Sequence, residues 1–136
     1  MIKVVLSGYS GFPYSKSATR QKQMLIAKAI QINPGYNTII INYISYSNKT
    51  ISKKGFFDGV SYKVNSLFSK KPTNRFLSLI NLTYGYVNEL IFLLRFNPNF
   101  LIVADRNIIY LIMVLIISKL SSIKLILTAV EDFESL

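Results

Sequence analysis

A chain of 136 residues with 51% apolar side chains is long enough to bury one core and too short for two ordinary domains. It has no cysteine and no histidine, so disulfides, thiolate zinc sites, thiol nucleophiles and the commonest general base are absent, and no metal site is expected. Lysine and arginine number 16 against 6 acidic residues, and the net charge of +10 predicts an anionic partner: lipid headgroups, phosphorylated substrates or nucleic acid.

The N-terminal third of the chain has the pattern of strand, loop, helix and strand. Short apolar runs bounded by glycine and polar residues are typical of buried strands. Ser17 or Thr19 is the expected N-cap of the helix, and Pro34-Gly35 is expected to end it. The predicted elements are a strand at residues 2–6, a loop over residues 8–17, a helix over residues 19–30 and a strand at residues 38–43.

The remaining two thirds continue the alternation of strands and helices. Residues 45–58 are polar and predicted to be an excursion without regular structure, and the alternating residues 59–64 are predicted to be an edge strand. Further elements are a basic turn at residues 70–75, one long or kinked helix over residues 76–95, a strand at residues 100–103, a helix over residues 107–120 and a strand at residues 123–127.

This order predicts an α/β domain, a Rossmann-like parallel sheet with helices on both faces. The apolar run at residues 108–117 is too short to cross a bilayer, which takes roughly 20 residues. No secretory signal is visible at the N-terminus, so a cytoplasmic location is the expectation.

Ligands of such a sheet gather beyond the carboxyl ends of its strands, here the loops after Leu6 and Val103. Gly8 and Gly11 lead toward a helix whose free N–H groups could receive a phosphate; alternatively they only turn the chain. The glycine spacing does not fit the NAD fingerprint, no acid ends the second strand, and no Gly-Lys-Ser/Thr of a P-loop follows. NAD binding and ATP hydrolysis are both disfavoured.

Several segments together resemble the N-terminal, acceptor-side half of family 4 glycosyltransferases of the GT-B fold. These enzymes move a sugar from a nucleotide-sugar to an acceptor. The resemblance spans nearly the whole chain; where the family often has Gly-Gly and Gly-His, this chain has Ser17-Ala18 and Gly35-Tyr36. The similar segments are residues 2–8, residues 17–20 with 25–30, the strand led by Gly35, residues 58–62 and residues 123–133.

The resemblance implies that residues 1–136 form a truncated family 4-like N-terminal domain, without the C-terminal domain that holds the nucleotide-sugar. The implied function is the acceptor-binding half of a glycosyltransferase acting on a glycan or lipid-linked acceptor, inactive alone, with a separate C-terminal domain as partner. No cofactor is expected beyond the nucleotide-sugar as donor substrate. The alternative is a non-catalytic basic α/β module that binds an anionic membrane or nucleic acid.

Candidate site residues follow from position. Gly8, Gly11, Ser17, Thr19 and Arg20 are candidates for a loop that binds the donor phosphates, with Arg20 either a bidentate donor or a solvated surface arginine.

Two pairs are candidates for the acceptor cleft. Asp105-Arg106 follows the strand at residues 100–103, and Asp105 could orient an acceptor hydroxyl or cap the next helix. Glu131-Asp132 follows the last strand and could bind sugar hydroxyls or begin a further helix.

A basic and apolar segment is a candidate for contact with a membrane. Lys70, Lys71, Arg75 and Phe76 begin an amphipathic pattern suited to an anionic surface, such as the inner face of the cell membrane; alternatively the pattern belongs to a helix that faces the core. Nucleic acid is the rival partner, disfavoured because no recognised nucleic-acid-binding motif accompanies the charge.

Overall fold

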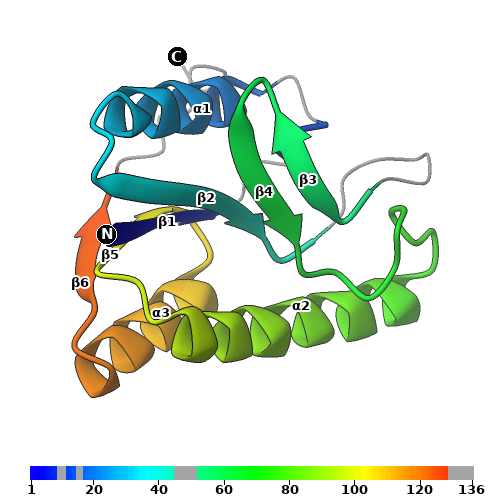
Figure 1. The fold of residues 1–136 in the computed structure, drawn as a ribbon. Helices are drawn as coiled ribbons and strands as arrows, with labels where there is room; N and C mark the ends of the chain where they lie inside the picture. The colour runs from blue at the N-terminus through cyan, green and yellow to red at the C-terminus, as the bar shows by residue number, and fades with distance from the viewer. Residues whose placement is uncertain (9–11, 15–16, 45–51, 129–136) are drawn as a thin grey trace, which may run out of the picture.

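The computed structural model describes residues 1–8, 12–14, 17–44 and 52–128. In this part of the chain, helices and strands alternate as in Figure 1. The elements are β1 (Ile2–Gly8), α1 (Ala18–Gln31), β2 (Tyr36–Asn42), β3 (Lys54–Phe57), β4 (Val60–Val64), α2 (Arg75–Phe96), β5 (Phe100–Ala104), α3 (Ile108–Leu120) and β6 (Lys124–Leu127).

The strands form one sheet in the order β3-β4-β2-β1-β5-β6. The pair β3–β4 is antiparallel, and the other neighbouring strands are parallel. β1 lies near the centre, hydrogen-bonded to β2 on one side and to β5 on the other. The chain therefore has the Rossmann-like α/β fold that the sequence predicts.

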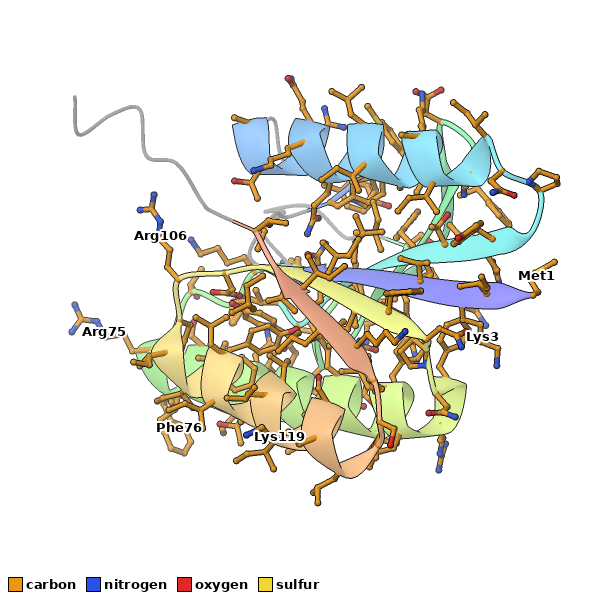
Figure 2. All side chains as sticks on the ribbon, turned by 90° about the vertical axis from the view of Figure 1, so that its left-hand side faces the viewer. Met1, Lys3, Arg75, Phe76, Arg106 and Lys119 are labelled. Carbon is orange, nitrogen blue, oxygen red and sulfur yellow. The ribbon has the colours of Figure 1, made fainter. Side chains whose placement is uncertain are left out.

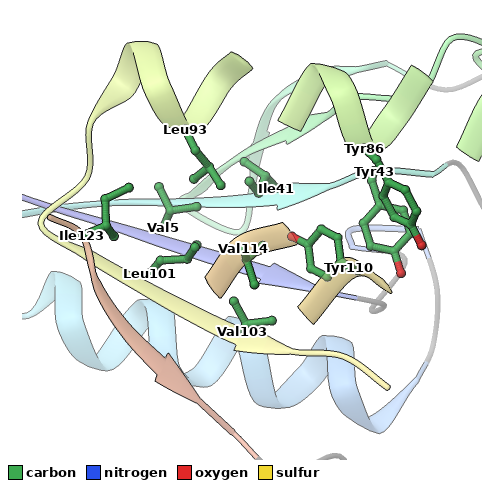
Figure 3. Close-up of a cluster of buried hydrophobic side chains, with 10 residues drawn as sticks. All are labelled: Val5, Ile41, Tyr43, Tyr86, Leu93, Leu101, Val103, Tyr110, Val114 and Ile123. Atoms are coloured by element: carbon green, nitrogen blue, oxygen red, sulfur yellow. The ribbon is translucent and has the colours of Figure 1, made fainter. Parts of the chain in front are cut away.

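Helices cover both faces of the sheet, as predicted. α1 lies on one face, and α2 and α3 lie together on the other (Figure 1). Because successive side chains of a strand point to opposite faces, Val4 and Leu6 of β1 pack into the core under α1, while Val5 packs into the core under α2 and α3 (Figure 3). Burial on both faces explains why the central strands are almost continuously apolar.

Two predictions about this side of the sheet are wrong: no strand was expected at β3, and the strand at residues 59–64 is not the edge strand. Lys54–Phe57 lies within the segment predicted to lack regular structure, yet it forms β3, so the edge strand at this side is β3 and not β4. Asp58 and Gly59 both have positive φ and join Phe57 to Val60 in a two-residue hairpin turn, for which Asp-Gly is a strong sequence signal.

The helices begin at side chains that cap their free N–H groups. Ser17 Oγ accepts a hydrogen bond from the backbone N of Arg20 at 3.1 Å, which confirms Ser17 as the N-cap of α1. Asn74 Oδ1 accepts from Phe76 N at 2.8 Å at the start of α2. α2 ends at Asn97 in the left-handed region, directly before Pro98.

α2 lies unusually close to the end of β2 at one residue. A Cβ atom on Gly85 would lie 1.8 Å from the carbonyl oxygen of Tyr43. Only glycine permits this approach, which explains a helix-destabilising residue in the middle of α2.

We predict that Gly85→Ala lowers the free energy of unfolding by about 3 kcal/mol, because α2 must move away from Tyr43 and the core under it loses its packing. Urea denaturation followed by circular dichroism measures the change. Gly35→Ala is the matched control, since the nearest atom to its added Cβ, Asn33 Oδ1, is 3.5 Å away. Equal unfolding midpoints for the two variants would show that the contact does not constrain α2.

Candidate functional site

The carboxyl ends of the central parallel strands meet at one edge of the sheet. Gly8 at the end of β1 is in register with Ala104 at the end of β5, and Ser7 is in register with Ile41 of β2. As far as they are described, the loops over residues 8–20 and 104–107 therefore leave the same edge, as the sequence predicts. We call this the carboxyl edge.

Gly8 lies so close to Ala104 of the neighbouring strand β5 that no side chain fits at this position. Its φ is +132°, and an added Cβ would lie 1.9 Å from the carbonyl oxygen of Ala104. A side chain at this position would separate the two strands at the carboxyl edge, so the glycine keeps them paired there. Gly11, the second glycine of the predicted phosphate loop, lies outside the described residues.

The other donor-phosphate candidates lie at the start of α1. Ser17 is exposed and its hydroxyl caps the helix, while Thr19 is half-buried in the first turn. The guanidinium carbon of Arg20 lies 5.5 Å from the centroid of the Phe57 ring, a cation–π distance, and its Nε is buried without a hydrogen-bond partner. Arg20 is thus partly enclosed by β3.

Asp105 is engaged on both carboxylate oxygens. Oδ1 accepts from the backbone N of Asn107 at 2.8 Å, and Oδ2 accepts from the hydroxyl of Tyr43 at 2.7 Å. The alternative that Asp105 caps α3 is wrong: Asn107 is the N-cap, because its Oδ1 accepts from Ile109 N at 3.0 Å and from Tyr110 N. Arg106 is exposed (Figure 2).

The remaining candidates divide into two groups. Glu131 and Asp132 lie outside the described residues. Lys70, Lys71, Arg75 and Phe76 are exposed in the turn before α2 and in its first residues. Figure 2 shows Arg75 and Arg106 projecting from one end of the molecule, with Met1 at the opposite end.

A buried polar cluster beneath the carboxyl edge was not recognised as a unit from the sequence. Glu89 of α2 is fully buried, and its Oε2 accepts from the hydroxyl of Tyr110 at 2.6 Å and from Ser7 Oγ at 3.3 Å. The Ser7 and Tyr110 hydroxyls also contact each other. The available signal was that Glu89 is the single acid in a long apolar helix.

Burial raises the pKa of Glu89 to about 8, because the charged form loses its hydration; hydrogen bonds from Tyr110 and Ser7 oppose the rise, and the charge of Asp105 adds to it. Burial and the neighbouring Glu89 raise the pKa of Tyr110 well above its ordinary range. Both side chains are therefore predominantly neutral at pH 7, which removes the cost of a buried charge.

Tyr110 also packs with two further tyrosine rings, those of Tyr43 and Tyr86 (Figure 3). The ring centroids of Tyr43, Tyr86 and Tyr110 lie 4.8 to 5.5 Å apart. Their hydroxyls contact Asp105, Asn107 and Glu89 respectively. All three are buried, so they belong to the core beneath the carboxyl edge.

Two arginines, and no cluster of acidic side chains, lie on the described elements that leave the carboxyl edge. Among the described residues, no group of three or more acidic side chains could hold a metal ion. Arg20 and Arg106 supply positive charge at the elements that leave the carboxyl edge. In comparisons with known proteins, no protein-family model, no curated protein and no solved structure matches the chain.

We predict that stability falls as the pH rises from 4.5 to about 8, with a limiting slope of roughly 1.4 kcal/mol per pH unit. The folded chain holds the Glu89 proton over this range and the unfolded chain releases it, so the contribution is complete below pH 4.5 and lost above about 8. Because the chain has no histidine and no cysteine, few other groups titrate in this pH range.

Chemical denaturation at a series of pH values measures this dependence. Glu89→Gln keeps a neutral side chain of similar shape, so its stability is expected to vary much less over the same range. A wild-type curve as flat as that of the variant would show that Glu89 is already ionised in the folded chain.

Proposed function

We propose that this domain is the acceptor-side half of a glycosyltransferase that moves a sugar from a nucleotide-sugar to a glycan or lipid-linked acceptor. The observation that supports this proposal is the carboxyl edge, where the ends of β1 and β5 pair at Gly8 and Ala104. In open α/β sheets, ligands bind beyond this edge, at the point where the strand order reverses. β1 is that point here, since β2 and β5 leave it on opposite sides.

The two loops have different roles in the proposal. The loop before α1 faces the donor diphosphate, and Arg20 lies in the first turn of α1. This assignment follows because a helix N-terminus and a guanidinium both favour anions. Arg106 lies on the acceptor side and binds an anionic group of the acceptor. Asp105 positions this loop through Tyr43 and Asn107, so its carboxylate acts on the backbone and not as a base.

A second domain completes the enzyme in this proposal. Transfer from a charged leaving group needs donors positioned on the diphosphate and a cleft closed to water. A C-terminal transferase domain supplies the opposite wall and most of the nucleotide contacts. The lipid-linked acceptor and the basic composition favour work at the inner face of the cell membrane.

We predict that the chain alone transfers no sugar. The purified chain is incubated with several nucleotide-sugars and a lipid extract that contains sugar-diphosphate lipids, and product is measured as radiolabel in the lipid phase. A complete family 4 enzyme is the positive control. Turnover by this chain above that of a heat-killed sample would contradict the claim that it is half of an enzyme.

We further predict that Arg106→Gln weakens binding of a sugar-diphosphate lipid in detergent micelles at least fivefold, because an Arg–phosphate pair is a charge-assisted contact. Lys22→Gln is the matched control: it removes one exposed positive charge from α1. Titration calorimetry measures both. Equal affinities for the two variants would favour the non-catalytic basic module.

A further inference from the structure

The outer face of α2 is apolar and its inner face contains polar residues. The residues of α2 that are buried are Asn81, Gly85, Tyr86, Glu89 and Leu93. Leu82, Phe92 and Phe96 pack against the same core, so α2 is apolar on its inner side as well. An ordinary surface helix has polar residues on the side that faces water, and α2 does not.

The exposed apolar residues of α2 form one stripe. Their spacing of three and four residues places them on a single side of the helix. Phe76 is 68% exposed and Val87 is 51% exposed. The stripe consists of Phe76, Ile80, Tyr84, Val87, Ile91 and Leu94.

α3 continues this surface beside α2. Ile108, Ile112 and Ile116 follow one another at helical spacing and are exposed, as is Leu115. The buried residues of α3 are Tyr110, Val114 and Ser118. Since both helices lie on the same face of the sheet (Figure 1), their exposed sides form one layer, which we call the outer helical face. An exposed apolar surface that extends over two neighbouring helices is typical of an interaction surface.

Positive charges flank the outer helical face at both ends, and neither of its two helices carries an exposed acid. Arg75 and Arg106 are exposed at the N-terminal ends of α2 and α3 (Figure 2), and Arg95 and Lys119 are exposed near the C-terminal ends. Glu89 is the only acid on α2 and is fully buried, and α3 has none.

We propose that the outer helical face docks on an anionic membrane, with α2 and α3 lying in the plane of the interface. Apolar residues between cations suit this position, because the apolar side chains enter the acyl region while arginine and lysine reach the lipid phosphates. This surface lies on α2 and α3 and meets the carboxyl edge only at Arg106, and the proposal rests on the exposed side chains of the two helices and not on the proposed function.

α2 does not cross the membrane in this proposal. By length and composition it is the one described helix long and apolar enough to do so. However, its Gly85 contacts the backbone of Tyr43, its Glu89 contacts Ser7 and Tyr110, and Lys3 Nζ donates to the carbonyl oxygen of Phe96 at 3.1 Å. A spanning helix would lose these contacts and carry Glu89 into lipid.

Charge also argues against a second copy of the chain as the occupant. Cations flank both ends of the outer helical face, so a face-to-face pairing of two copies would bring arginine and lysine together, and the described residues of α2 and α3 place no exposed acid between them. Like charges placed together across an interface are costly, whereas an anionic lipid surface complements them.

Vesicle flotation tests the charge dependence. The chain is synthesised in vitro with vesicles of either phosphatidylcholine alone or phosphatidylcholine with phosphatidylglycerol. We expect binding to the anionic vesicles, with Arg75→Gln weakening it about fivefold at low salt and Lys22→Gln on α1 leaving it unchanged. Equal binding to both kinds of vesicle, or equal effects of the two substitutions, would overturn the proposal.

Apolar substitutions test which face binds. We expect Val87→Ser combined with Ile112→Ser to weaken binding at least tenfold, since each side chain is 51% exposed and enters the acyl region. Leu25→Ser is the control, because Leu25 is 64% exposed on α1, on the opposite face of the sheet. Circular dichroism verifies that the variants fold.

Tryptophan reporters test the depth. The chain contains no tryptophan, so a single one gives an unambiguous signal. Tyr84→Trp and Ile112→Trp should shift to shorter emission wavelength on anionic vesicles and be quenched by lipids brominated near the headgroup, while Leu25→Trp should not respond. Strongest quenching of Tyr84→Trp by lipids brominated at the bilayer centre would indicate a spanning α2 and overturn the proposal. Dimerisation that the double serine variant abolishes, without vesicle binding, would overturn it in favour of a second copy.

Discussion

The buried carboxyl group of Glu89 connects three elements of the molecule. It lies on α2, and its hydrogen bonds reach Ser7 of β1 and Tyr110 of α3. A buried carboxyl group left without hydrogen-bond partners would be costly, so these partners fix the rotation of α2 about its axis. Once that rotation is fixed, Gly85 faces the end of β2 and the apolar stripe of α2 faces outward. The surface of the helical layer is thus a consequence of one polar group in the core.

Most of the fold could be predicted from the sequence, because the central strands are buried on both faces and read as unbroken apolar runs. The edge strand β3 could not be recognised in the same way. Lys54–Phe57 is exposed along most of its length and includes a glycine, so it lacks both the apolar run and the alternation of a buried strand. The rotation of α2 was also unpredictable, since a helix that is apolar on most sides does not show which side faces the core.

The location of the candidate site at the end of the central strands could be predicted from the sequence, whereas the contacts of its residues could be predicted only in part. Parallel strands put Gly8 and Ala104 at one edge, which follows from topology alone. The partners of Asp105 do not follow from its position, because Tyr43 is far away in sequence and meets it only through the sheet order. Glu89 lies far from the loops along the chain, so its contact with Ser7 needed the packed structure.

The central position of β1 also sets an order for folding during synthesis. Its partner β2 ends at Asn42, whereas its other partner β5 begins at Phe100, so the half of the sheet under α1 can form while later residues are still inside the ribosome. Until β5 emerges, one edge of β1 stays unpaired and α2 has no α3 beside it. During this interval the nascent chain is prone to aggregate, because chaperones and neighbouring nascent chains bind unpaired strand edges and exposed apolar helices.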